Sequence, residues 1–476
     1  MQRRTKIVAT VGPATQTQPR LTALIEAGVD VFRINSSHGT PRSRQAAAGR
    51  IRHASDAAGR MVAILQDLAG PKIRIGDVAS GARLEAGARF RIATGDFAGS
   101  AERVATSYAP LAQLVQPGNR LLLDDGRLAV RVLKTDGSEI VTEVEHGGPL
   151  ASRKGINAPD VDFPLSAITS ADIENLERAL LAGVDFIGVS FVQCADDMRR
   201  AREAAERIGR PAALVAKIER PRAVDRFDEI LAESDAVMVA RGDLGIEVPL
   251  ERVPRVQKSM TRRARAAGVP VIVATQVLET MTHQPRPTRA EVSDAANAVD
   301  DGVDAIMLSG ETAVGAHPER VVRTLDAIIR DAEASHDDAA VRAAAGFDVH
   351  FLDRMLADDT RYGDEVCAAA VMLAETSGAK AVVAVTRSGR TVRDLSAIRP
   401  RVPVHAVTDD LTLSRRLGLA WGVAPHTVAP GPGSPGVIRE ELLREGIVRS
   451  GDVVVFVRVN DDLSLPAGNF IELLRC

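Results

Sequence analysis

Three segments of the chain repeat one short pattern, and this repeat constrains the fold more than any other feature. In each segment an amphipathic helix runs into a glycine, and an apolar strand follows directly. The copies are Ala27-Gly28-Val29-Asp30, Ala182-Gly183-Val184-Asp185 and Asp301-Gly302-Val303-Asp304. A glycine that ends a helix just before a buried strand is typical of alternating helix–strand units. We therefore expect parallel strands joined by helices.

Short, nearly continuous apolar runs recur through the first and third quarters of the chain, and they alternate with helical segments. Such runs are typical of parallel strands that are buried on both faces. The eight predicted strands are Ile7–Val11, Val31–Asn35, Val62–Gln66, Phe186–Ser190, Leu214–Ile218, Ala236–Ala240, Val271–Thr275 and Ala305–Leu308. Eight of them predict an α/β fold of the (β/α)₈ TIM-barrel type.

The regular spacing fails once, between the third and fourth predicted strands. In that interval Leu128, Val130 and Val132 alternate with Arg127 and Arg131, which is the period of a half-buried strand. Turn signals interrupt the interval at Thr94-Gly95-Asp96, Asp125-Gly126 and Asp136-Gly137. We therefore expect an inserted all-β domain, a β-barrel lid over residues 73–152, with the catalytic barrel formed by residues 1–72 and 153–333.

A polar, alanine-rich stretch at 332–345 is predicted to be a linker. Beyond it, helices alternate with four further predicted strands. These are Ala381–Val385, Val402–Val407, Val453–Val459 and Phe470–Leu474. This alternation predicts a C-terminal α/β domain with a mostly parallel sheet over residues 346–476.

The bulk composition excludes several classes of partner. A formal net charge of −3 argues against nucleic acid or a membrane surface, since either needs a basic face. Apolar runs such as Val453–Val457 are far too short to span a bilayer, and Met1–Thr10 lacks the apolar segment of a signal peptide. Three scattered cysteines are odd in number and lack metal-ligand spacing. We expect a cytoplasmic protein.

Polar and charged residues gather where the predicted barrel strands end, which is where the chemistry of such barrels takes place. They are Arg33, Asn35, Ser37, His38, Asp67, Lys217, Glu219, Arg241, Gly242, Asp243, Thr275, Ser309 and Glu311. We find no comparable set at the opposite strand ends. The carboxyl rim is therefore the predicted active site.

Glu219 and Asp243 follow neighbouring strands, so together they can hold a Mg²⁺ or Mn²⁺ ion. Lys217 lies two residues before Glu219 and points to the same face of its strand. With Arg33 across the barrel mouth, these groups describe a pocket for a multiply charged anion. Phosphoryl transfer needs such a pocket, because its catalysis consists largely of positioning and charge neutralisation.

Each of these residues has an ordinary structural explanation when it is taken alone. Glu219 or Asp243 could cap a helix, Lys217 could simply pair with Glu219, and Thr275 and Ser309 could be helix caps. It is their combination on one rim that favours a catalytic site.

Nine long motifs occur in order from the first strand to the last barrel strand. They are Thr5–Ala14, Arg33–Gly39, Gly70–Arg74, Lys154–Asn157, Ala216–Glu219, Met238–Gly245, Ala274–Gln276, Pro285–Glu291 and Met307–Thr312. With these motifs the chain resembles the pyruvate kinase family along nearly its whole length. The resemblance implies transfer of the phosphoryl group of phosphoenolpyruvate to ADP, giving pyruvate and ATP. It also implies a homotetramer.

The resemblance also implies roles at the substrate. Glu219 and Asp243 would hold Mg²⁺, and backbone N–H groups near Gly242 and Asp243, with Thr275, would position the substrate carboxylate. Lys217 would neutralise the phosphoryl group during transfer, and Arg33 would bind the phosphate. Thr275 and Ser309 would organise the water that protonates enolpyruvate.

At the nucleotide the resemblance implies that Arg74 and Lys154 hold the ADP phosphates, with Asn35 and His38 nearby.

One departure from the family pattern concerns K⁺. The family's monovalent-cation ligands map to Asn35, Ser37, Asp67 and the backbone carbonyl of Leu68, and members that need K⁺ carry Glu where this chain has Lys72. Lysine is scarce here, with 7 lysines against 53 arginines. A compact ammonium at this position predicts that K⁺ is not required. The alternative is that Lys72 simply points into solvent at the lid hinge.

A second segment indicates regulation. Thr386, Arg387, Ser388, Gly389, Arg390 and Thr391 follow a predicted strand and open a helix. Backbone N–H groups at such a turn favour an anion, and a phosphorylated sugar or nucleoside monophosphate would suit the side chains. The alternative is a plain solvated turn. The loop Pro466–Asn469 departs from the family loop that closes over an effector, which weakens the case for fructose 1,6-bisphosphate.

Two other functions remain open from the sequence. One is a Mg²⁺-dependent barrel enzyme that acts on carbon bonds of pyruvate-like substrates, although such an enzyme needs neither the lid nor Arg74 and Lys154. The other is a catalytically dead sensor that binds metabolites through its C-terminal domain. Such a sensor has no reason to keep Lys217, Glu219, Asp243 and Thr275 together.

Overall fold

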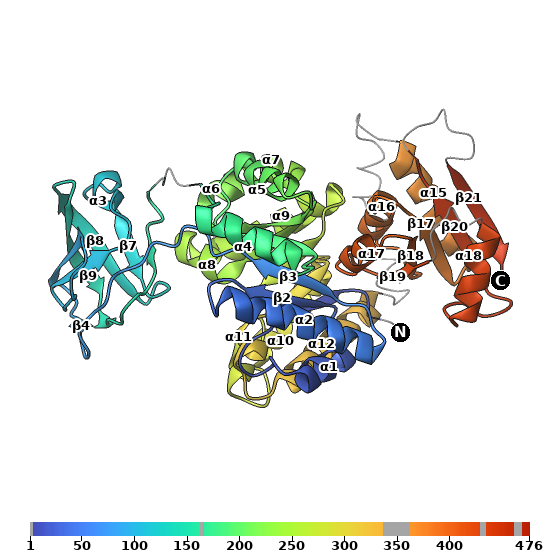
Figure 1. The fold of residues 1–476 in the computed structure, drawn as a ribbon, viewed down its shortest axis with the longest axis horizontal. Coiled ribbons are helices and arrows are strands. Elements are labelled where there is room, and N and C mark those ends of the chain that lie inside the picture. Colours follow the sequence, from blue (N-terminus) through green and yellow to red (C-terminus); the bar gives the residue numbers. More distant parts are fainter. Residues whose placement is uncertain (1–2, 162, 164–165, 337–361, 429–434, 461–468) are drawn as a thin grey trace.

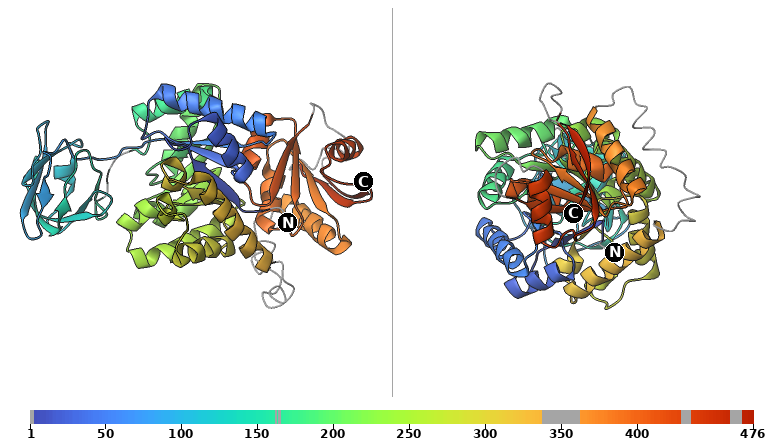
Figure 2. Two further views of the ribbon diagram at one scale, coloured as in Figure 1. Left: turned by 90° about the horizontal axis from the view of Figure 1, so that it is seen from below. Right: turned by 90° about the vertical axis from the view of Figure 1, so that its right-hand side faces the viewer.

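The computed structural model describes residues 3–161, 163, 166–336, 362–428, 435–460 and 469–476. Three bodies follow one another along the long axis of the molecule (Figure 1). The inserted lid lies at one end, the barrel in the middle and the C-terminal domain at the other end, and the view from below agrees (Figure 2). Lid and C-terminal domain therefore lie at opposite ends of the barrel.

The predicted barrel is confirmed. Eight parallel strands close on themselves in the order β1-β16-β15-β14-β13-β12-β3-β2. They are β1 (Lys6–Thr10), β2 (Val31–Asn35), β3 (Ala63–Asp67), β12 (Phe186–Val189), β13 (Ala213–Ile218), β14 (Ala236–Ala240), β15 (Val271–Ala274) and β16 (Ala305–Leu308). Each bound lies within one residue of its predicted position. The strand interiors are fully buried, as expected for parallel strands under a ring of helices.

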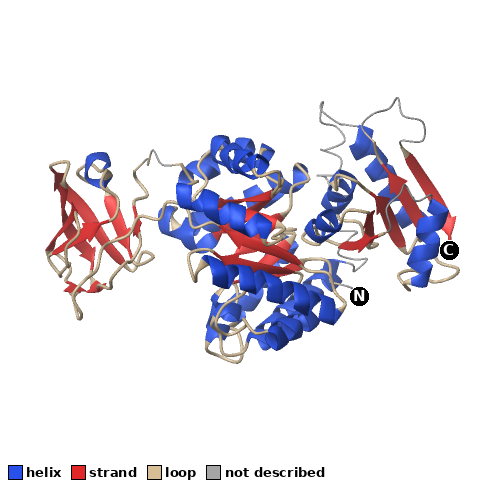
Figure 3. Ribbon diagram, viewed as in Figure 1, coloured by secondary structure: helices blue, strands red, loops and turns tan. Residues whose placement is uncertain are grey.

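Helices surround these strands (Figure 3). They are α1 (Gln18–Ala27), α2 (Pro41–Ala58), α4 (Ser170–Leu181), α5 (Ala195–Arg207), α6 (Pro221–Asp225), α7 (Phe227–Ala232), α8 (Arg241–Glu247), η1 (Leu250–Arg252), α9 (Val253–Ala266), η2 (Glu279–Thr282), α10 (Arg289–Asp300), α11 (Gly310–Ala313) and α12 (Pro318–His336). The repeated glycine does end helices: Gly28 has φ 121°, a conformation that side-chain-bearing residues rarely adopt.

The aspartate that closes the repeated pattern has a structural role at the barrel base. Asp30, Asp185, Asp235 and Asp304 precede β2, β12, β14 and β16, every second strand around the barrel. The side chain of each accepts a hydrogen bond from a backbone N–H of the preceding strand, and its own N–H donates to the carbonyl of that same residue. The four partners are Ile7, Ile64, Leu214 and Val271.

Each of these aspartates also pairs with an arginine. Asp30 pairs with Arg3, Asp185 with Arg52, Asp235 with Arg202, and Asp304 with Arg399. Three of the arginines belong to the barrel, whereas Arg399 comes from the C-terminal domain. The expectation that the opposite strand ends carry no comparable polar set was therefore wrong: the base holds a regular set of carboxylates, and their role is structural.

The lid is all-β, as predicted. A six-stranded sheet has the order β11-β7-β8-β9-β5-β6, and a two-stranded sheet joins β10 to β4. The elements are β4 (Arg83–Leu84), β5 (Arg89–Thr94), β6 (Arg103–Thr106), α3 (Leu111–Leu114), β7 (Arg120–Leu123), β8 (Leu128–Thr135), β9 (Glu139–His146), β10 (Gly148–Pro149) and β11 (Ile156–Asn157). The sheet thus continues past the predicted limit at residue 152, because β11 pairs with β7.

The C-terminal domain has a five-stranded sheet in the order β19-β18-β17-β20-β21, parallel except for β21. Its elements are α15 (Tyr362–Ser377), β17 (Ala381–Val385), α16 (Arg390–Ile398), β18 (Val404–Thr408), α17 (Leu411–Leu417), β19 (Val423–Thr427), α18 (Pro435–Arg444), β20 (Val453–Arg458) and β21 (Phe470–Arg475). Strand β19 escaped prediction, because Pro425 and His426 interrupt its apolar character and only one neighbour pairs with it.

The predicted linker begins too early. Helix α12 continues to His336, so the first residues of 332–345 are helical. The rest of that stretch, and Pro466–Gly468 of the departing loop, lie outside the described residues. Throughout the described ranges, we find no helix with the length and apolarity needed to cross a membrane.

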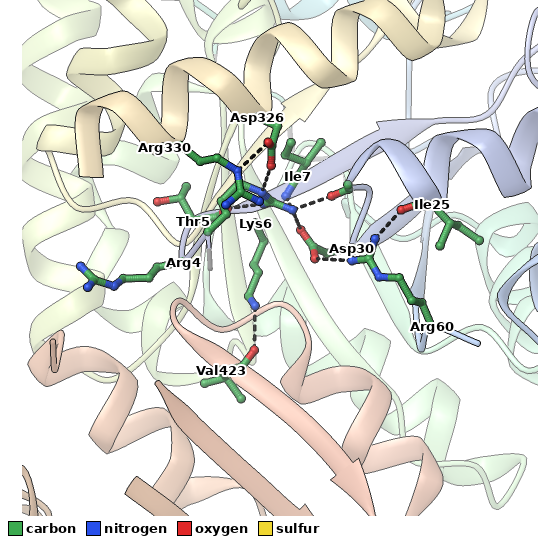
Figure 4. A network of polar contacts seen from close by, with 12 residues as sticks. Arg4, Thr5, Lys6, Ile7, Ile25, Asp30, Arg60, Asp326, Arg330 and Val423 are labelled. Carbon is green, nitrogen blue, oxygen red and sulfur yellow. Dashed lines mark hydrogen bonds and ion pairs between the residues drawn. The ribbon is translucent and has the colours of Figure 1, made fainter. Parts of the chain in front are cut away.

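The C-terminal domain is anchored on the barrel base. Leu419 packs into the apolar cluster that fills the barrel, and the buried ammonium of Lys6 donates to the carbonyl of Val423 at 2.7 Å (Figure 4). Arg399 Nη1 and the N–H of Trp421 both donate to Asp304 Oδ1. Trp421, the single tryptophan of the chain, is contacted by the guanidinium groups of Arg4 and Arg399.

The base carboxylates generate a prediction about stability. In Asp185→Ala the buried N–H of Ile64 loses its acceptor and half-buried Arg52 loses its carboxylate. We expect the free energy of unfolding to fall by about 3 kcal/mol in urea denaturation. Asp331→Ala, at an exposed position of α12, serves as control and should change it by less than about 0.5 kcal/mol. Similar losses in both variants would contradict the assigned role.

Candidate active site

Lys217, the last residue but one of β13, lies at the centre of the charged rim. Its Nζ lies 2.6 Å from Glu219 Oε1, 2.8 Å from Ser190 Oγ and 3.5 Å from Asp67 Oδ2. Burial by itself would lower the pKa of Lys217, but the carboxylates of Glu219 and Asp67 outweigh it and the pKa is raised. The side chain is therefore an ammonium ion that is held in place on three sides.

Glu219 and Asp243 form the predicted metal-binding pair. Glu219 Oε2 accepts the N–H of Phe191, and its pKa is raised by burial and by the nearby charge of Asp243, against the opposing effect of Lys217. Glu219 is buried and Asp243 is half-buried, and two neighbouring carboxylates that repel each other favour a divalent cation. Among the described residues there is no group of three or more metal-binding side chains. The donor set therefore fits Mg²⁺, which uses one or two carboxylates and takes its remaining ligands from water and substrate.

Arg33 and Asp67 form a second buried pair on the neighbouring strands β2 and β3. Arg33 Nε lies 2.8 Å from Asp67 Oδ2, the oxygen that also faces Lys217. Burial alone would raise the pKa of Asp67, but Arg33 and Lys217 hold it below its usual value. The other oxygen, Oδ1, is buried and has no hydrogen-bond partner. Gly188 leaves the room for it, because a Cβ there would lie 2.2 Å from that oxygen.

Thr275 and Gln276 form a strained turn after β15. Their φ values are 68° and 54°, and a β-branched residue such as Thr275 rarely adopts this left-handed conformation. Arg241 holds the turn, because its guanidinium donates to the carbonyls of Thr275 and Gln276 and pairs with Asp294. Thr275 Oγ1 accepts the N–H of Gly242 at 2.7 Å.

Ser309 follows β16 and is held by Glu311. Glu311 is fully buried, and its two oxygens accept the N–H groups of Ser309 and Leu278. Burial raises the pKa of this carboxyl. Ser309 Oγ is itself buried without a hydrogen-bond partner, so it can bind a water or a substrate atom at the rim.

The predicted nucleotide residues divide between rim and lid. Asn35 ends β2, its Oδ1 accepts the N–H of Ser37, and His38 follows at an exposed position. Lys154 Nζ lies 2.7 Å from Asp124 Oδ1 of the lid, and Arg74 donates to the carbonyl of Arg153.

Lys72 is also at the hinge. Its Nζ lies 3.9 Å from Asp125 Oδ1 of the lid, and its side chain is 30% exposed. In this arrangement the two hinge lysines face two lid carboxylates.

Comparisons with known proteins agree with this geometry. Residues 2–322 match the family model "Pyruvate kinase, barrel domain", and residues 364–460 match "Pyruvate kinase, alpha/beta domain". The chain belongs to the pyruvate kinase family. The pyruvate kinase of Mycobacterium tuberculosis is 44% identical over 100% of this chain and 99% of its own length. That of Corynebacterium glutamicum is 42% identical over 92% of this chain and 90% of its own length.

The fold agrees as well. The crystal structure of a pyruvate kinase from Cryptosporidium parvum superposes with a TM-score of 0.91 at 34% identity, covering 100% of this chain and 96% of that one. As a pyruvate kinase, the chain transfers the phosphoryl group of phosphoenolpyruvate to ADP.

Sequence reasoning missed two residues of this pyruvate kinase site. Ser190 follows β12 and links Lys217 to the carbonyl of Leu68. Glu247 accepts a hydrogen bond from Asn157 next to the lid hinge, and burial raises its pKa. The signal for Ser190 was present, since it was the terminal residue of a predicted strand. Glu247 lies on α8 beyond the strand end, and nothing in the pattern marked it.

The segment predicted to bind an effector lies far from the rim, in the C-terminal domain. Thr386, Arg387, Ser388, Arg390 and Thr391 line a cavity of about 330 Å³, together with residues that include Arg458 and Asn460. Gly389 has φ 80° and donates its N–H to Thr386 Oγ1, which shapes the turn.

Proposed function

We propose that phosphoryl transfer takes place over Lys217, with the remaining rim residues in the roles that their positions support. The observation that carries this proposal is the buried ammonium of Lys217, which is held by Glu219, Asp67 and Ser190. A fixed positive charge in a water-poor site stabilises the charge on a phosphoryl group in transfer. Arg33, fixed by Asp67, binds the phosphate of phosphoenolpyruvate from the other side.

Glu219 and Asp243 would hold the divalent cation. When bound, Mg²⁺ supplies charge neutralisation to the substrate carboxylate and to the enolate oxygen. The N–H groups of Gly242 and Asp243, with Thr275, position that carboxylate. When substrate binds, the N–H of Gly242 exchanges its bond to Thr275 Oγ1 for one to the substrate.

The proton that converts enolpyruvate to pyruvate comes from a water held by Thr275 and Ser309. The unpartnered hydroxyl of Ser309 supports this role, because a buried hydroxyl without a partner is costly unless a water or substrate completes it. On the nucleotide side, Arg74 and Lys154 bind the ADP phosphates, next to Asn35 and His38. Lys154 is released from Asp124 when it does so.

A coupled assay with phosphoenolpyruvate, ADP and Mg²⁺ tests the reaction. The same assay distinguishes phosphoryl transfer from the carbon-bond chemistry of related barrels and from a dead sensor, because neither of these yields ATP.

Replacing Lys217 with methionine separates the two half-reactions. We expect phosphoryl transfer to slow at least about 100-fold, because the charge that stabilises the transferring group is lost. Exchange of solvent protons into pyruvate should largely persist, because it depends on Mg²⁺, Thr275 and Ser309. Lys258→Met, at an exposed lysine paired with Asp301, is the matched control. Equal losses of both half-reactions would assign Lys217 another role.

We also propose that the enzyme works without K⁺. Exchanging Glu for Lys at position 72 changes the local charge by about two units, which disfavours a second cation nearby. Asp67 Oδ1 is buried and has no hydrogen-bond partner, so it is the oxygen to which a cationic group would bind. Lys72 faces Asp125 in the arrangement described here, so the proposal requires that lid closure carries its ammonium toward the rim.

Activity in a K⁺-free buffer with Tris or tetramethylammonium as counter-ion tests this proposal. Adding K⁺ should raise the activity less than about twofold, because the ammonium already supplies the charge. Lys72→Glu should lower activity without K⁺ and restore a K⁺ response. Strong activation of the wild type by K⁺ would show that Lys72 remains at the lid.

The third element of the proposal is regulation through the 330 Å³ cavity of the C-terminal domain. Its arginines and hydroxyls suit a phosphorylated sugar or a nucleoside monophosphate. We expect such a metabolite to shift the phosphoenolpyruvate saturation curve to lower concentration in the wild type but not in Arg387→Ala. If a broad panel leaves the curve of the wild type unchanged, the cavity has no regulatory role.

Three coarser features complete the proposed function. They are a homotetramer, a cytoplasmic location, and the division into a catalytic barrel (1–72 and 153–333), a lid (73–152) and a C-terminal domain (346–476). The family membership supports the first two, and the arrangement of the three bodies in Figure 1 supports the third.

A further inference from the structure

A second cavity, of about 150 Å³, lies where the C-terminal domain meets the base of the barrel. The barrel contributes the starts of β12, β13 and β14, with Phe186 and Asp235 among the lining residues. The C-terminal domain contributes α16 and α17, including Arg393, Leu413 and Arg416. The cavity is thus at the opposite end of the barrel from the catalytic rim.

Arg393 is the unexplained group in this cavity. It is half-buried, and its guanidinium makes no hydrogen bond or ion pair with any part of the chain that the structure describes. A guanidinium carries five N–H donors and its charge is permanent. Partly removed from water and without an acceptor, it creates a local demand for an anion.

The other charges of the cavity wall are already engaged. Arg416 donates to the carbonyls of Asp185 and Pro211, and the carboxylates of Asp185, Asp235 and Asp410 favour its charge from nearby. Asp235 is bound to Arg202 and to the N–H of Leu214, so its charge is balanced on the barrel side. Two arginines and one aspartate line the cavity, so the formal charge of its wall is positive. Burial lowers the pKa of Arg416, and an anion would offset this unfavourable environment.

Apart from Ser388, the rest of the wall is apolar. Phe186, Leu413, Leu417 and Leu419 face the same space, so a fully hydrated ion such as inorganic phosphate would leave these surfaces without a matching partner. The volume also lies below the ~300–1,000 Å³ of pockets for drug-sized ligands, which excludes a nucleotide. A compact molecule with one carboxylate and a short aliphatic body matches the charge, the apolar wall and the size.

We propose that this interdomain cavity binds a short-chain aliphatic carboxylate, with the carboxylate on Arg393 and the hydrocarbon against the leucines of α17. The site is distinct from the 330 Å³ cavity, which lies on the other side of the Thr386–Thr391 turn; only Ser388 lines both. A ligand here contacts barrel and C-terminal domain together, so its binding free energy adds to the docking of the two.

Saturation-transfer NMR with isobutyrate as the probe tests the proposal on the full-length enzyme. Mg²⁺ and saturating phosphoenolpyruvate without ADP keep the probe out of the active site, and Arg387→Ala serves as the background in which the 330 Å³ cavity is impaired. We expect binding in that background and at least about tenfold weaker binding when Arg393→Gln is added, because a charge-assisted hydrogen bond is lost. Arg393→Lys should retain part of the affinity, and Arg401→Gln, at an exposed arginine, should retain all of it.

Two further probes test the assigned chemistry. Isobutyramide, the neutral isostere, should bind at least about tenfold more weakly than isobutyrate if the cavity recognises charge. Inorganic phosphate should compete poorly with isobutyrate.

Fluorescence of Trp421, next to the lining residue Ala420, should change when isobutyrate binds to the wild type but not in Arg393→Gln. Any one of four outcomes would overturn the proposal: no binding of isobutyrate, unchanged affinity in Arg393→Gln, equal binding of the amide, or stronger binding of phosphate. Steady-state activity of Arg393→Gln without the probe should equal that of the wild type, which confirms that the variant is folded.

Discussion

The carboxylate that precedes every second barrel strand is the interaction on which the rest of this structure depends. Asp30, Asp185, Asp235 and Asp304 each bind the backbone of the preceding strand in both directions and each pair with an arginine. These contacts fix the strands in pairs at the barrel base. Because these contacts already fix the register of the strands, the polar groups at the opposite rim are not needed to hold the strands in place.

The buried charges of the rim reduce the stability of the fold. Lys217, Glu219, Asp67 and Arg33 are all nearly inaccessible to solvent, and buried charges destabilise a fold unless each has a partner. Here every ion is paired, yet one oxygen of Asp67 and the hydroxyl of Ser309 remain without hydrogen-bond partners. Unsatisfied buried groups are uncommon in native structures and concentrate where a ligand completes them. The same applies to the left-handed turn at Thr275, a strained conformation that persists because Arg241 holds its two carbonyls.

Much of this arrangement followed from sequence because its causes are local. The eight barrel strands were predicted to within one residue, since glycine-ended helices and continuous apolar runs are short-range signals. The rim set followed because parallel strands must end at the same edge. Strand β19 did not follow. Its half-buried His426 lies beside buried His405 of β18, with ring nitrogens 2.9 Å apart, so a polar residue interrupts the apolar pattern of β19.

The base carboxylates show a different limit. The repeated Asp30, Asp185 and Asp304 were visible in the sequence as the last letter of a motif, but their partners are backbone groups on other strands. Because every residue except proline has a backbone N–H, the sequence does not indicate which of them bonds to a given carboxylate. The position of Lys72 was also beyond local reasoning, because it depends on how the lid sits relative to the barrel.

The fourth base carboxylate joins the two ends of the molecule. Asp304 alone among the four takes its arginine from the C-terminal domain, through Arg399 at the end of α16. The opposite end of that helix, with Arg390 and Thr391, lines the 330 Å³ cavity. Asp304 in turn directly precedes β16, and Ser309 on the catalytic rim directly follows that strand. Helix and strand are both rigid elements, so a shift of α16 along its axis must either strain the bond between Arg399 and Asp304 or move the start of β16. One continuous route from the domain to the rim therefore passes through the carboxylate of Asp304. A second begins where Arg416 donates to the carbonyl of Asp185, because Asp185 precedes β12 and Ser190, the partner of Lys217, follows that strand.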